Sequence, residues 1–168
     1  VDKRLATNLV YGVLQHKLTL EYWLASFIKG KKIESWVKTL LLMSIYQYRY
    51  LDRVPDWAVT NESIELAKQL GNPGTRRFVT GVLHAVLRQG LRDVNAIEDP
   101  IKRRSVEFSL PQWLVDELIK QYGQSTADAI FKAVNEPARV SLRVNEAKAT
   151  IPQAIAILKE QGVEVEPS

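Results

Sequence analysis

The chain contains no cysteine and only two histidines, His16 and His84, among its 168 residues. The lack of cysteine excludes disulfides, thiolate metal sites and a cysteine nucleophile within these residues. Two histidines far apart in the sequence argue against a zinc site. GxSxG, HExxH and Walker A motifs are also absent, and no carboxylate pair stands in an apolar setting suited to acid–base catalysis. We therefore expect no catalytic residue, no bound cofactor and no metal in this chain.

Long apolar runs are missing too. None approaches the roughly 20 residues that a membrane-spanning helix needs, and no signal peptide opens the chain. A hydrophobic content of 46% is sufficient for a buried core, and a charged fraction of 25% is ordinary for a globular protein. These features predict a cytoplasmic protein with no membrane partner.

Positive charge is concentrated in the first half of the chain. Residues 1–90 contain 13 Lys and Arg against 7 Asp and Glu, a net charge of +6. Residues 91–168 contain 10 against 12, a net charge of −2, and the two parts give the total of +4. A basic half favours a polyanionic partner, although an excess of six charges is modest.

Hydrophobic periodicity predicts a mainly all-α protein. Helices are expected over 2–16, 19–29, 35–51, 55–70, 75–89, 100–108, 112–122, 125–136 and 150–161. Thr19 is expected to cap the second of them, and Ser109 with Gln112 to form a capping box. Alternating apolar residues predict strands over 139–145 and 163–166, so the chain would end in a truncated β-α-β unit.

The stretch YQYRYLDRVP, residues 46–55, places three tyrosines at alternate positions. They could stack nucleic-acid bases, but helical spacing around them favours core and boundary positions in a central helix. Lys38, Arg49 and Arg53 fall on one narrow polar stripe and remain candidate RNA contacts.

A second basic stripe is expected on the helix that follows the loop GNPGT. Arg77, Gly81, His84 and Arg88 align at spacings of four, three and four, and Arg76 stands at the helix start. The stripe could contact RNA phosphates, or it could be an ordinary solvated face; spacing alone does not separate the two. The run at 102–104 is interpreted as solvated, with Arg103 pairing with Glu107.

Several segments together resemble one family. They are LVYGVL, YLDRVP, NESIELAK, RRFVTGVLHAVLR, LPQWLVDELIKQYG and NEPARVSLRVN. In this order they are similar to the NusB-like domain and following segments of the RsmB (also called Sun or Fmu) 16S rRNA cytosine-5 methyltransferases. Thr80 and His84 stand where that family usually has Asn and Arg, and Leu110 where it usually has His.

The resemblance implies three regions. Residues 1–92 would be a NusB-like RNA-binding bundle without its first helix, 93–137 connecting helices, and 138–168 the start of a small RNA-recognition-motif-like subdomain. The family's S-adenosylmethionine-binding domain and its catalytic cysteines have no counterpart here, so we expect the gene to continue beyond Ser168.

The resemblance also implies a function. The chain would help a bacterial, cytoplasmic methyltransferase engage 16S rRNA, with S-adenosylmethionine and the chemistry supplied by its own C-terminal methyltransferase domain. Two alternatives remain: a free-standing NusB-like antitermination factor, and a protein-interaction module that uses an apolar patch from Val54 to Trp57.

Overall fold

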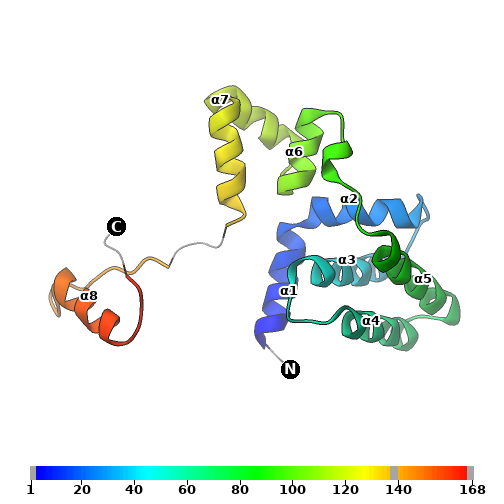
Figure 1. The fold of residues 1–168 in the computed structure, drawn as a ribbon, viewed down its shortest axis with the longest axis horizontal. Coiled ribbons are helices and arrows are strands. Elements are labelled where there is room, and N and C mark those ends of the chain that lie inside the picture. The colour runs from blue at the N-terminus through cyan, green and yellow to red at the C-terminus, as the bar shows by residue number, and fades with distance from the viewer. Residues whose placement is uncertain (1–2, 137–139, 166–168) are drawn as a thin grey trace. The chain divides into compact units, whose positions relative to one another are not determined.

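The computed structural model describes residues 3–136 and 140–165, and the chain divides into two compact units, 1–135 and 136–168 (Figure 1). The first unit contains α1 (Lys3–Gln15), α2 (Lys17–Ile28), α3 (Ser35–Tyr50), α4 (Asp56–Leu70), α5 (Pro73–Gln89), the 3₁₀ turn η1 (Val94–Ala96), α6 (Pro100–Phe108) and α7 (Gln112–Val134). The second contains α8 (Ile151–Glu160). The expectation of a mainly α-helical protein is confirmed.

Helix α3 is the centre of the bundle, as its nearly continuous apolar surface predicts. It packs against α1, α2, α4 and α5, and Figure 1 shows it between α1 and α5. Leu41 and Ile45 of α3 are completely buried. On α1, Gly12 allows a close approach to α3, because a Cβ there would lie 2.1 Å from the ring of Tyr46. The core therefore depends on a small residue at this crossing.

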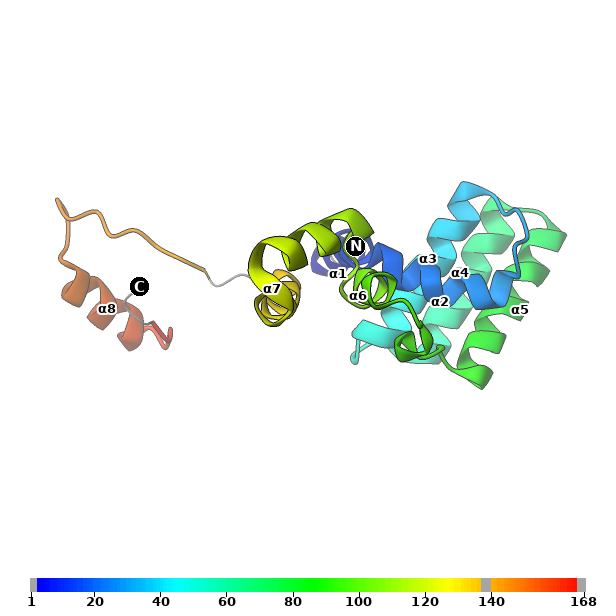
Figure 2. The same cartoon turned by 90° about the horizontal axis from the view of Figure 1, so that it is seen from above.

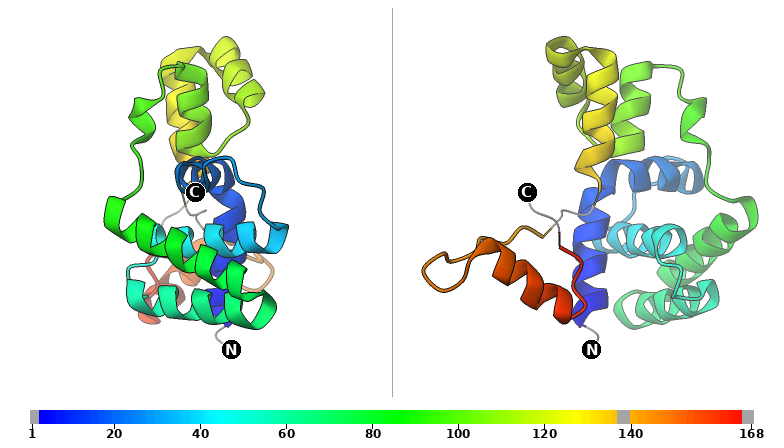
Figure 3. Two further views of the ribbon diagram at one scale, coloured as in Figure 1. Left: turned by 90° about the vertical axis from the view of Figure 1, so that its right-hand side faces the viewer. Right: turned by 60° about the vertical axis from the view of Figure 1, so that its left-hand side comes forward.

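The segment α6–α7 forms a second, smaller core and is attached to α2 (Figure 3). Gly123 (φ 75°) interrupts α7, as its sequence position predicts, so Val115 before it and Phe131 after it are buried in the same cluster. The Thr19 hydroxyl donates a 2.5 Å hydrogen bond to the Val106 carbonyl. The expectation that Thr19 caps α2 is wrong, because α2 already begins at Lys17.

The predicted capping box at Ser109 and Gln112 is also wrong. Ser109 ends α6 in the left-handed conformation, and its hydroxyl accepts a hydrogen bond from the Leu18 amide at 3.0 Å. The Ser109 hydroxyl oxygen was expected to accept from an amide of α7, but it accepts instead from Leu18, which is distant in the sequence. Local capping does occur at two other helix starts: the Asp99 side chain accepts from the first amides of α6, and Thr150 and Gln153 form a capping box at the start of α8.

The described part of the second unit contains α8 but no strand. Residues 140–145 and 163–165 were expected to form strands; Arg139 and Glu166, at the ends of those ranges, lie outside the described residues. A lone strand leaves its backbone amides and carbonyls without partners, and two short ones do not make a stable sheet. Val140 and Leu142 are accordingly exposed.

Candidate nucleic-acid interface

The turn between α4 and α5 is built from the sequence Gly71-Asn72-Pro73. The Gly71 amide donates to the Ala67 carbonyl at 3.2 Å and ends α4. The Asn72 side chain then accepts from the Thr75 amide at 3.0 Å, while Pro73 occupies the first turn of α5, where its missing N–H costs nothing. This short connection makes α4 and α5 neighbours (Figure 2).

Helix α5 separates apolar from basic residues. Four residues on one side are buried in the bundle: Val79, Val82, Leu83 and Val86. At 100° per residue, the opposite arc of about 140° holds the basic positions. They are Arg76, Arg77, His84 and Arg88, together with Gly81, and all five are exposed. The predicted stripe is therefore a real outward face of α5.

A pocket of about 620 Å³ lies where this face meets the end of α4. Lys68, Gly71 and Asn72 line it from α4 and the turn. The rest of its lining comes from α5: Pro73, Arg76, Arg77, Thr80 and Gly81. The pocket thus brings together the two predicted arginines at the start of α5, and His84 and Arg88 continue the same helix face beyond it.

The pocket's electrostatics are dominated by cations. Lys68 forms an exposed ion pair with Glu65 at 3.2 Å. The pKa of Glu65 lies below its ordinary value because Gln69 and Lys68 donate hydrogen bonds to its carboxylate, with a further contribution from the charge of Arg76. Among the ion pairs of residues 3–136, none involves Arg76, Arg77 or Arg88. Their charges are therefore available to an external anion.

Lys38, Arg49 and Arg53 are arranged differently. Lys38 forms a 2.7 Å ion pair with Glu21 of α2. Arg49 is exposed and lies 5.7 Å from the centroid of the Tyr50 ring. Arg53 lies in the turn after α3, beyond its last residue. None of the three lines the pocket, and the helical stripe expected to join them ends before Arg53.

The three tyrosines of residues 46–55 are buried or half-buried in the bundle, and each contacts another residue of it. Tyr46 is 6% exposed and donates to Asn8 at 2.7 Å, and the Tyr48 hydroxyl lies 2.8 Å from that of Thr60. The Tyr50 ring stacks on His16 with centroids 4.3 Å apart. Burial raises the pKa of each of these tyrosines. The core interpretation is confirmed, and base stacking on them is not supported.

Sequence reasoning missed Lys68, which reaches the pocket from α4. The available signal was its position three residues before Gly71, which places it on the last turn of α4 beside the start of α5. Two further observations concern chemistry. Among the described residues, no group of three or more His, Cys, Asp or Glu is arranged to hold a metal, and no helix is long and apolar enough to cross a membrane.

The basic half and the remainder of the chain match different family models. Residues 1–88 match the NusB family, and residues 110–168 match the ferredoxin-like domain of the RsmF/B-like methyltransferases.

Individual relatives match almost the whole chain. A probable ribosomal RNA small subunit methyltransferase B of Bacillus subtilis (strain 168) is 42% identical over 166 residues, which are 98% of this chain and 37% of the relative. The corresponding protein of Synechocystis sp. is 28% identical over 89% of this chain and 34% of its own length. The ribosomal RNA small subunit methyltransferase B of Klebsiella pneumoniae (strain 342) is 29% identical over 97% of this chain and 37% of its own length. The chain spans little more than a third of these relatives.

Proposed function

This chain belongs to the NusB family, and on that premise we propose that it is the RNA-binding N-terminal region of a 16S rRNA (cytosine-C5) methyltransferase. Its task is to hold rRNA in place for a catalytic domain that uses S-adenosylmethionine. The observation that carries the proposal is the outward basic face of α5, with Arg76 and Arg77 free to meet phosphates. Lys38, Arg49, Arg53, His84 and Arg88 remain proposed secondary contacts.

The amino-acid composition indicates that catalysis would take place in another part of the protein. Methyl transfer to C5 of cytosine in this family is expected to need a cysteine thiolate, and these 168 residues contain no cysteine. The nucleophile and the cofactor would therefore come from the protein's C-terminal methyltransferase domain, which is also the proposed partner of this chain. The setting would be the bacterial cytoplasm, where the rRNA substrate is made.

The ferredoxin-like part of the proposal concerns residues 138–168. We propose that 140–145 and 163–165 form strands of a sheet in a longer protein that contains the rest of the domain. The alternation of Val140 and Leu142 with polar residues supports this, and so does the exposure of Ile151 and Ile157 on α8, which lack a sheet to cover. Amide hydrogen exchange on a longer protein should show protected amides at 140–145; rapid exchange there would contradict it.

Charge reversal tests RNA binding. Arg76→Glu/Arg77→Glu should weaken binding to 16S rRNA fragments and lower the salt slope of log K by about 1 to 2, since up to two phosphate contacts disappear. Acidic residues suit a helix N-terminus, so the fold should survive. Filter binding at two salt concentrations provides the measurement.

The matched control is Lys102→Glu/Lys132→Glu, which makes the same change in net charge at exposed sites of α6 and α7. If both double variants lose affinity equally, binding follows net charge alone and the α5 face has no special role. If wild-type protein fails to bind at micromolar concentration, the proposal of RNA engagement is wrong.

A second candidate function is protein docking. Trp57 is 69% exposed at the start of α4, beside half-buried Val54, which favours an apolar contact with a protein. Binding through this patch should be unaffected by Arg76→Glu/Arg77→Glu and reduced by Trp57→Ala. A free-standing antitermination factor is less well supported, because residues 110–168 match a methyltransferase domain.

A further inference from the structure

The pocket between α4 and α5 has an apolar body and a cationic rim. Its lining includes the Pro73 ring, two glycines without side chains, Gly71 and Gly81, and the basic residues Lys68, Arg76 and Arg77, whose side chains have long aliphatic stems. Some of its polar atoms are engaged: the Asn72 side-chain oxygen Oδ1 accepts from the Thr75 amide, and the Thr80 hydroxyl donates to the Arg76 carbonyl at 2.8 Å. The lining therefore provides apolar contact area together with the positive charges of Lys68, Arg76 and Arg77.

This combination does not suit a phosphate alone. A phosphate needs donors and positive charge, which the exposed helix face already provides without a cavity. A volume of about 620 Å³ falls in the range of pockets that hold small organic ligands. A flat ring with apolar faces, linked to an anion, would match both the wall and the rim.

Gly81 gives independent support. A Cβ at this position would meet nothing within 4 Å, so neither helix packing nor a left-handed backbone requires glycine here. Glycine inside a helix is less favourable than alanine by about 1 kcal/mol. The chain thus keeps a destabilising residue at an α5 position that lines the pocket and not the core.

We propose that this pocket receives the base of one unpaired RNA nucleotide, whose adjoining phosphates are held by Arg76 and Arg77. The inference rests on the proposed function and specifies the RNA that the face recognises. A base within a duplex is stacked and paired and cannot enter, whereas a bulged or looped base is free to leave the stack. Arginine planes and apolar walls are common partners of such bases. Recognition would therefore favour irregular RNA over a regular helix.

The test uses the whole chain and two RNA hairpins that differ only by one bulged nucleotide. Fluorescence anisotropy should show the bulged hairpin binding about tenfold tighter, the size expected for one stacked base. Gly81→Leu, which would fill the pocket without changing charge, should remove this preference, so that the two hairpins bind with equal affinity. Gln89→Leu, on another side of α5 and also exposed, is the control and should keep the preference.

The outcomes separate the two levels of inference. Equal binding of both hairpins by wild-type protein, or an unchanged preference in Gly81→Leu, overturns the nucleotide pocket while RNA engagement stands. Failure to bind either hairpin overturns the proposed function itself. Competition by adenosine monophosphate but not by inorganic phosphate supports a base-specific pocket. Equal competition by inorganic phosphate shows that only the charged rim binds and contradicts the proposal.

Discussion

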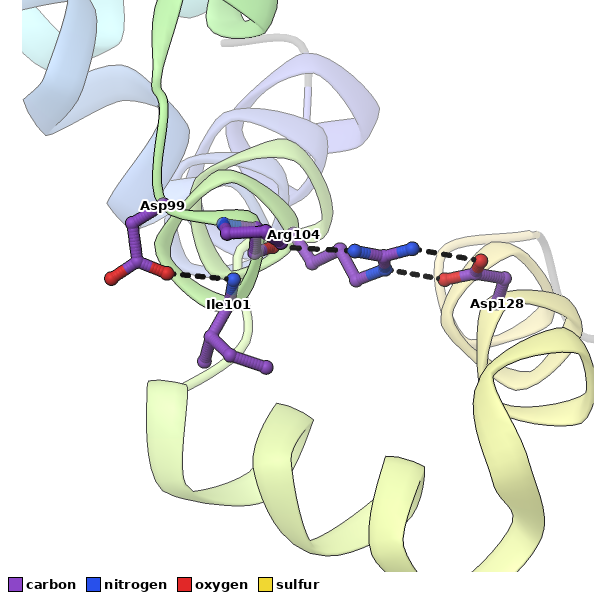
Figure 4. A network of polar contacts seen from close by, with 5 residues as sticks. Asp99, Ile101, Arg104 and Asp128 are labelled. Atoms are coloured by element: carbon purple, nitrogen blue, oxygen red, sulfur yellow. Dashed lines mark hydrogen bonds and ion pairs between the residues drawn. The ribbon is translucent and has the colours of Figure 1, made fainter.

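Helices α5 and α6 each carry a run of basic residues, yet the structure uses the two runs in opposite ways. Arg76 and Arg77 of α5 are exposed and make no ion pair among residues 3–136. Arg104 of α6 is 12% exposed and reaches Asp128 of α7 through two contacts, Nε–Oδ1 at 2.6 Å and an NH2–Oδ2 bond at 3.1 Å (Figure 4).

The comparison shows that the role of a cluster of basic residues cannot be inferred until its ion-pair partners are known. On the α5 side, the α4 carboxylate that interacts with Arg76 is that of Glu65, which is already hydrogen-bonded to Lys68 and Gln69. On the α6 side, α7 changes direction at Gly123, and its second half places Asp128 where Arg104 can donate two hydrogen bonds to it. Arg76 and Arg77 have no ion pair among the described residues, whereas Arg104 joins α6 to α7.

The largest expected effect comes from breaking the ion pair. Arg104→Ala should lower the free energy of unfolding by about 2 kcal/mol, because the partly buried Asp128 carboxylate loses both of its donors. Arg76→Ala should change it by no more than about 0.5 kcal/mol, as for most exposed substitutions. Urea denaturation of the two variants measures the difference, and equal losses would remove the distinction between the runs.

Acid should weaken the same contact. The hydrogen bonds from Arg104 lower the pKa of Asp128 below its ordinary value of 3.8, so the folded state favours the ionised carboxylate. This contribution is complete well above pH 4 and is lost as the pH falls through about 4 toward the folded pKa. Asp128→Asn should therefore lose less stability than wild type between pH 5 and pH 3, since Glu65 contributes equally to both. Parallel acid curves would contradict the assignment.

A gain in stability is expected on the α5 side. Gly81→Ala should raise the free energy of unfolding by up to about 1 kcal/mol, because alanine is the better helix former and its Cβ meets no atom within 4 Å. Gly12→Ala is the contrasting variant and should be destabilising, since its Cβ would lie 2.1 Å from Tyr46. Thermal melts followed by circular dichroism would show the two shifts in opposite directions.

The smallest effect is expected for an exposed basic residue of α6, which can be compared with Arg104 on the same helix. Lys102 is exposed next to the ion-paired Arg104, with no ion pair among the described residues. Lys102→Ala should change stability by less than about 0.5 kcal/mol and leave the affinity for RNA unaltered. A clear loss of RNA affinity would extend the binding surface to α6, which a filter-binding titration would detect.

Much of the fold was predictable because helical signals are local. The ends of α4 and α5, and the caps at Asp99 and Thr150, follow from residues within one turn of each other. The failures at Thr19 and Ser109 share one feature: each hydroxyl forms its hydrogen bond with a residue about 90 positions away. The expected strands are not seen in the described residues for a related reason, since a strand is stable only with a partner.

The candidate site also has one part that local sequence predicts and one part that depends on helix packing. The outward position of Arg76, Arg77, His84 and Arg88 follows from 3.6-residue periodicity, whereas Lys68 and the pocket depend on how α4 and α5 meet. The sequence alone assigns no contact to His16, but its ring stacks on Tyr50, and burial lowers its pKa. No local pattern could have shown that contact, because α3 supplies the other ring.

By itself, the sequence determined where the helices run, which side of α5 carries its arginines, and that no thiolate chemistry occurs within these residues. Tertiary structure alone decided which of the basic residues are neutralised, since Arg104 and Asp128 are 24 positions apart and Arg76 has no such partner among the described residues. Periodicity acts over a few residues, but the strength of an ion pair depends on distance in space and on exclusion of water, both of which are set only when helices pack.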